Sequence, residues 1–94
     1  MTRQTSEDRH IADNIQSVVE YLRAHFQDAE INAGPDDQPL MHAFAVRLRF
    51  GEQLRLRMRV SLLADKENSG SYIHGLLSRA DVAKQLRENK TWDL

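Results

Sequence analysis

Five arginines concentrate in one short stretch of this chain, residues 41–63 (MHAFAVRLRFGEQLRLRMRVSLL), which contains no lysine. The planar guanidinium of arginine pairs with carboxylates and phosphates through two parallel hydrogen bonds, whereas lysine is a flexible point charge. This choice of residue indicates recognition of an acidic group. We therefore predict that the partner-binding residues are Arg47, Arg49, Arg55, Arg57 and Arg59. The plainer alternative is a solvated sheet face whose charges discourage aggregation.

Other reactive residues do not form a recognisable site. His10, His25, His42 and His74 lack metal-binding spacing, and the chain has no cysteine. No Gly-x-Ser-x-Gly motif and no phosphate-binding glycine loop occur. We predict no catalytic, cofactor or metal site, and we expect a protein that is not an enzyme.

The arginines alternate with apolar residues on both sides of Gly51. A period of two is typical of a strand with one buried and one exposed face, so the stretch predicts an antiparallel hairpin over about 41–63. Residues that face each other across a pair lie on the same face, which requires a loop with an odd number of residues. A loop of residues 51–53 would pair Phe44 with Val60, Val46 with Met58 and Leu48 with Leu56. It would also set Arg49 opposite Arg55 and Arg47 opposite Arg57, and leave Phe50 facing an apolar partner.

Apolar residues at steps of three and four predict a helix from about residue 6 to 27. Residues 29–33 predict a short strand, 34–39 a loop with two prolines, and 64–71 an exposed loop. Residues 71–89 are helical, either as one kinked helix or, as we prefer, as two helices over about 71–77 and 79–89, because Ser78 and Asp81 resemble a capping box. We expect the N-terminus (1–5) to fray and residues 90–94 to form a tail, with Trp92 docked against its own domain.

These elements predict a single α+β domain over residues 1–94. The N-terminal helix and one or two C-terminal helices should pack on one face of a small antiparallel sheet built around the hairpin. The predicted core contains Ile11, Ile15, Val18, Leu22, Phe26, Phe44, Val46, Leu48, Leu54, Leu56, Met58, Val60, Ile73, Leu77 and Leu86.

Charge is segregated along the chain. Residues 1–40 carry three arginines against eight acidic residues, and residues 41–63 carry five arginines against one glutamate. The two segments can neutralise each other within one chain or between copies. No apolar run approaches the ~20 residues that span a bilayer, and residues 1–10 contain no signal-like apolar segment. We expect a cytoplasmic protein that does not bind membranes.

The run GPDDQPLMHAFAVRLRFGE (34–52), within an order of helix, strands and helix, is similar to the first strands of double-stranded RNA-binding domains. This resemblance implies RNA binding, although SRADVAKQL (78–86) lacks the lysines that open the last helix of that family. We therefore expect a small interaction module that binds an acidic protein surface, or a second copy of itself, through the arginines. The alternative is binding of nucleic acid, including double-stranded RNA, by the same residues.

Overall fold

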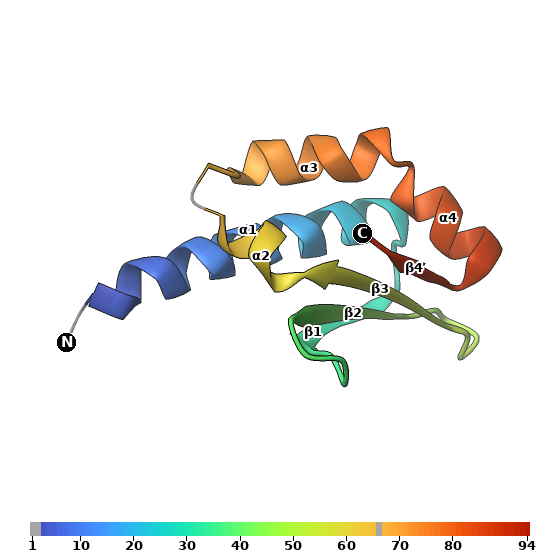
Figure 1. The fold of residues 1–94 in the computed structure, drawn as a ribbon. Helices are drawn as coiled ribbons and strands as arrows, with labels where there is room; N and C mark the ends of the chain where they lie inside the picture. Colours follow the sequence, from blue (N-terminus) through green and yellow to red (C-terminus); the bar gives the residue numbers. More distant parts are fainter. Residues whose placement is uncertain (1–2, 66) are drawn as a thin grey trace.

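The alternating stretch forms the two central strands of a sheet, which helices cover on one face in a computed structural model (Figure 1). The structure describes residues 3–65 and 67–94, with side chains from His10 onward. The architecture is α+β, as predicted, and the covering helices all lie on the same side of the sheet. In chain order the elements are α1 (Arg3–His25), β1 (Glu30–Pro35), β2 (Met41–Arg47), β3 (Gln53–Arg59), α2 (Val60–Ala64), α3 (Gly70–Arg79), α4 (Val82–Asn89) and β4 (Thr91–Asp93).

The strands of the described residues form one sheet in the order β1-β2-β3-β4. β1 and β2 pair antiparallel, and so do β2 and β3, whereas β4 lies parallel to β3. The sheet is therefore mixed rather than purely antiparallel. Residues 91–93, which we expected in a tail, supply the parallel strand, and Trp92 stands opposite Leu56. The indole packs against the core, as predicted.

The hairpin register differs from the prediction: each residue of β2 has a partner four residues earlier in β3 than expected. Phe44 pairs with Leu56 rather than Val60, and Val46 pairs with Leu54 rather than Met58, because the turn is centred on Phe50 in a loop of residues 48–52 rather than on Glu52 in a loop of residues 51–53. The amide of Leu48 donates to the carbonyl of Glu52 at 2.7 Å, and the amide of Gly51 donates to the carbonyl of Leu48 at 2.9 Å. Gly51 has a φ of +91°, which glycine adopts without the steric clash of a side chain.

The change of register separates the arginines. Arg55 stands opposite Ala45 and Arg57 opposite Ala43, so the predicted Arg49–Arg55 and Arg47–Arg57 pairs are wrong. Like charges across a strand pair are destabilising, and the alanines instead leave room for the arginine stems. The prediction for Phe50 is also wrong: its side chain lies in the loop and is 95% exposed.

The second strand ends earlier than predicted. Val60, which we placed in the strand, opens α2, and its amide donates to the carbonyl of Leu40 at 2.8 Å. This short helix places Leu63 in the core with no exposed surface. Val60 itself is only partly buried, so its assignment to the core is a correction.

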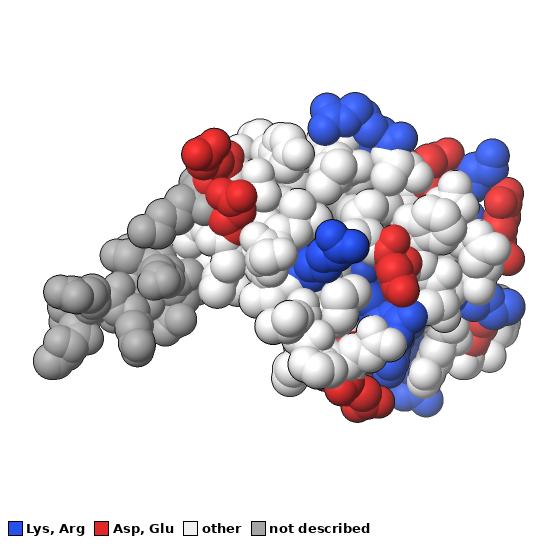
Figure 2. Space-filling model, in the orientation of Figure 1, with Lys and Arg blue, Asp and Glu red and all other residues white. Residues whose placement is uncertain are grey.

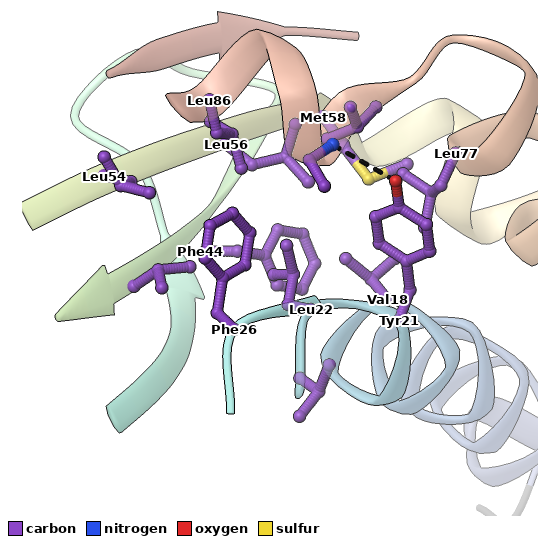
Figure 3. Packing of buried hydrophobic residues seen from close by; sticks show 14 of the residues in the cluster. Val18, Tyr21, Leu22, Phe26, Phe44, Leu54, Leu56, Met58, Leu77 and Leu86 are labelled. Carbon is purple, nitrogen blue, oxygen red and sulfur yellow. Dashed lines mark hydrogen bonds between the residues drawn. The ribbon is translucent and has the colours of Figure 1, made fainter. Parts of the chain in front are cut away.

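The core lies between the sheet and the helical layer (Figure 3). Val18 and Leu22 of α1, with Phe26 directly after the helix, face Phe44, Leu56 and Met58 of the sheet, as the periodicity predicted. Burial of this kind stabilises a domain by about 25 cal/mol per Å² of apolar surface. Ile11, Ile15 and Leu48 are only partly buried, contrary to prediction. Buried residues that the prediction omitted are Val19, Tyr21, Leu63, Val82 and Ala83.

The C-terminal helical region consists of two helices, as preferred, but the break lies at residues 80–81. Ser78 is inside α3, so the proposed capping box does not form. Asp81 adopts a left-handed conformation with a φ of 53° and its side chain makes no cap hydrogen bond. Tyr21 of α1 supplies the missing acceptor: its hydroxyl receives the backbone N–H of Ala83 at 3.1 Å (Figure 3). The start of α4 is thus held by α1.

Candidate interaction surface

The face of the sheet opposite the helices carries the predicted arginines. Leu54, Leu56 and Met58 point into the core, so the alternate residues of β3 point to the other face. This open face consists of Ala43, Ala45 and Arg47 from β2, Gln53, Arg55, Arg57 and Arg59 from β3, and Thr91 and Asp93 from β4. Arg49 lies outside it, in the hairpin loop. Figure 2 shows basic side chains grouped over the sheet with acidic side chains among them.

Arg57 is held by a carboxylate from the neighbouring strand. Its Nε donates to Oδ1 of Asp93 at 2.7 Å and its Nη2 donates to Oδ2 at 2.9 Å. The hydrogen bond with Asp93 raises the pKa of Arg57, with burial acting in the opposite direction. Only 22% of the side chain is exposed. The guanidinium is therefore fixed in orientation on the open face.

A second carboxylate lies between two arginines. The side chain of Asp36 is only 2% exposed, with Oδ1 at 3.3 Å from Arg55 and Oδ2 at 3.9 Å from Arg57. Oδ2 also accepts the backbone N–H of Gln38 at 3.2 Å, which links the carboxylate to the loop between β1 and β2. Pairing and hydrogen bonding of this kind offset the cost of burying a polar group. The loop thus positions one acidic group over the arginines.

The outer pairs are weaker. Arg47 lies 4.0 Å from Glu30, with more than 60% of each side chain exposed, and such pairs contribute little to stability. Lys90 pairs with Glu52 across the ends of β3 and β4. Arg49 and Arg59 are exposed and form no ion pair with the described side chains. The structure therefore divides the predicted set into three internally paired arginines and two that are not.

A hollow of about 420 Å³ lies on the open face beside these pairs. It exists because Ala45 and Thr91 are small, whereas the neighbouring residues of β3 are long. Cationic groups surround it, so the chemistry of the site suits a carboxylate or another small anion. The residues that line it are Ala45, Gln53, Leu54, Arg55, Arg57, Lys90 and Thr91.

The histidines are dispersed. Nε2 of His10 donates to the carbonyl of Asp65 at 2.6 Å, and His42 lies on the core side of β2, 5.2 Å from the Phe44 ring. Burial lowers the pKa of His42, and its Nε2 has no hydrogen-bond partner among the described residues. In the described part of the chain, no three carboxylate or imidazole groups are arranged to hold a metal ion.

Comparison with protein-family models, with curated protein sequences and with solved structures finds no match to this chain. Among the described residues, no helix combines the length and the apolar character needed to cross a bilayer.

Sequence reasoning named the arginines but missed Asp36 and Asp93 as their partners. The charge segregation between residues 1–40 and 41–63 was the available signal, and Asp36 and Glu30 both come from the acidic segment. Asp93 belongs to a segment without net charge, so no pattern pointed to it. Its position opposite Arg57 follows from the pairing of β4 with β3.

Proposed function

We propose that the chain is a non-enzymatic interaction module whose open face binds an acidic protein surface. One observation carries the proposal: the guanidinium groups of Arg55 and Arg57 are fixed by Asp36 and Asp93 at the edge of a hollow. An arginine that is already ordered loses less conformational entropy when it binds. Half of the Arg55 side chain is exposed, which leaves N–H donors available to a partner carboxylate.

The distribution of charge favours a protein over a nucleic acid as the partner. Asp36 lies between Arg55 and Arg57, and the edge strands place Glu30 beside Arg47 and Asp93 beside Arg57, so the face is not continuously positive. Arg49 and Arg59 are on opposite ends of the hairpin and do not form a row of adjacent phosphate contacts. A long polyanion would meet alternating charges, whereas a folded protein can present carboxylates only where arginines are free.

The test is fluorescence anisotropy with labelled poly-L-glutamate and, separately, with a labelled RNA duplex. The protein should bind poly-L-glutamate, and the affinity should fall as salt is raised, because the contacts are ionic. Arg55→Ser should weaken this binding. The matched control is Arg23→Ser, which removes the same charge from the exposed face of α1.

Two results would contradict the proposal. Equal loss of binding in Arg23→Ser and Arg55→Ser would show attraction by overall charge alone. Tighter binding to the RNA duplex than to poly-L-glutamate, lost in Arg55→Ser, would favour the nucleic-acid alternative instead.

A further inference from the structure

The hairpin carries an exposed apolar feature at each end. At one end Phe50 projects from the loop between β2 and β3 with 95% of its surface exposed. At the other end, where β2 begins and β3 runs into α2, Leu40 is 82% exposed. Leu40, Met41 and Val60 line a largely apolar hollow of about 430 Å³, together with Arg59 and Ser61. Figure 1 shows the hairpin loop and α2 at opposite ends of the two strands.

Both features are held in place by the backbone. Two hydrogen bonds close the loop around Phe50, so the ring is presented at a defined position. Leu40 has a φ of +68°, a left-handed conformation that is unfavourable for a residue with a side chain. The amide of Val60 donates to the Leu40 carbonyl and maintains this conformation. The backbone thus holds the leucine side chain outside the core of its own chain.

The charges beside the two features are complementary. Arg49 precedes Phe50, and Asp37 lies in the exposed loop that leads to Leu40. Neither forms an ion pair with a described side chain. Arg59, which lines the hollow, is also without such a pair, and a guanidinium at the rim of an apolar site can stack on an aromatic ring. An incoming Phe50 would therefore meet apolar side chains and a cation, while the adjacent Arg49 would meet Asp37.

We propose that copies of this chain associate head to tail, with Phe50 of one copy in the Leu40–Met41–Val60 hollow of the next. A chain cannot fill its own hollow, because the seven residues of β3 hold the two ends roughly 20 Å apart. In the proposed arrangement each copy gives its ring to one neighbour and its hollow to another, so the contact is heterologous and builds rings or open chains. A wild-type chain whose growth stops at the dimer would indicate a reciprocal two-fold pair and overturn this arrangement. The proposed contact uses neither the hollow on the open face nor the Arg57–Asp93 pair, so it does not rest on the proposed function.

The test is sedimentation velocity with the wild-type chain over rising concentration and no added ligand. The average sedimentation coefficient should increase with concentration. Phe50→Ser removes the inserted ring and Leu40→Ser alters its receptor, and each variant alone should remain monomeric. Both residues are exposed, so the fold should be kept, which circular dichroism verifies. Tyr72→Ser, at a third exposed apolar position, is the matched control and should associate like the wild type.

Mixing the two variants distinguishes this contact from others. Phe50→Ser retains the hollow and Leu40→Ser retains the ring, so an equimolar mixture should form heterodimers that grow no further. A wild-type chain that stays monomeric at every concentration would overturn the proposal. So would a mixture that stays monomeric while the wild type associates, because that result indicates a two-fold contact between like surfaces. Arg49→Asp should also weaken association, and Asp37→Arg in the same chain should restore it.

Discussion

Arg57 and Asp93 form a two-point ion pair across the parallel strands β3 and β4, with donor–acceptor distances of 2.7 and 2.9 Å. The strand that carries Asp93 has only three residues and lies at an edge of the sheet. Its backbone bonds include Arg55 N–H to the carbonyl of Lys90 and Leu94 N–H to the carbonyl of Arg57. So short a strand depends on side-chain contacts to remain paired.

Asp93→Asn should therefore loosen β4 without unfolding the protein. The amide keeps one acceptor oxygen but loses the second one and the negative charge, so the two-point ion pair with Arg57 is replaced by at most one hydrogen bond. Amide hydrogen exchange at Leu94 should accelerate several-fold, while exchange at the core amides of β2 should not change. Asp37→Asn is the control, since Asp37 forms no ion pair with a described side chain. Unchanged exchange at Leu94 would show that the backbone bonds alone hold the strand.

Tyr21→Phe should destabilise the fold by roughly 1–3 kcal/mol, because the buried amide of Ala83 would lose its acceptor. Urea denaturation followed by circular dichroism measures the change. Tyr72→Phe removes a hydroxyl from a side chain that is 44% exposed and should leave the stability within experimental error. If the two substitutions changed the stability equally, the hydrogen bond between Ala83 and Tyr21 would not be what stabilises the fold.

Asn14 is a buried polar residue of α1, with 1% of its surface exposed. Its Nδ2 lies 2.7 Å from the carbonyl of Leu63 and 2.9 Å from that of Asn68, so it ties α1 to α2 and to the following loop. Asn14→Ala should lower the free energy of unfolding by roughly 1–3 kcal/mol, because it leaves these carbonyls without their donor. Thermal denaturation gives the value, with the exposed Asn32→Ala for comparison.

His42 should make stability depend on pH. Burial lowers its pKa in the folded state, so between that value and the ordinary 6.5 the unfolded chain binds the proton and the folded chain does not. The contribution of His42 to the free energy of unfolding is fully present above pH 6.5, and it is lost as the pH falls from 6.5 toward the lowered pKa. Urea midpoints measured at about pH 7.5 and 5.5 should therefore decrease toward acid, and His42→Leu should reduce the decrease. If the urea midpoint of the wild type and that of His42→Leu fell equally with pH, groups other than His42 would cause the decrease.

Gly70 marks a close approach between α3 and α1. A Cβ at this position would lie 2.5 Å from Oγ of Ser17, which is itself bonded to the carbonyl of Asp13. Gly70→Ala should destabilise the protein by about 1–3 kcal/mol through overpacking. Ser17→Ala in the same chain should recover most of the loss, since only Cβ would then remain, at 3.7 Å. If the double variant were as unstable as Gly70→Ala, contact with the Ser17 hydroxyl would not be the cause of the destabilisation.

Local patterns in the sequence were sufficient to predict the main strands and the N-terminal helix, and which face of each is buried. The alternation around Gly51 predicted two strands and the side of each that is buried, because the period of two is a property of the extended backbone. The spacing of Val18 and Leu22 predicted the buried side of α1, and the burial of Phe26 directly after it, because side chains three and four residues apart share one face of a helix. These assignments need no knowledge of which segments meet.

Such local patterns could not predict which segments pair with each other, or in which register. A shift of four residues keeps every side chain on the same face, so the alternation cannot distinguish a loop of residues 51–53 from the loop of residues 48–52 that forms. That shift replaced two arginine–arginine pairs with arginine–alanine pairs. The partners of Arg57, which are 21 and 36 residues distant, follow from the loop over the sheet and from β4. Long-range contacts of this kind depend on how the whole chain closes around its core, and no short window of residues contains that information.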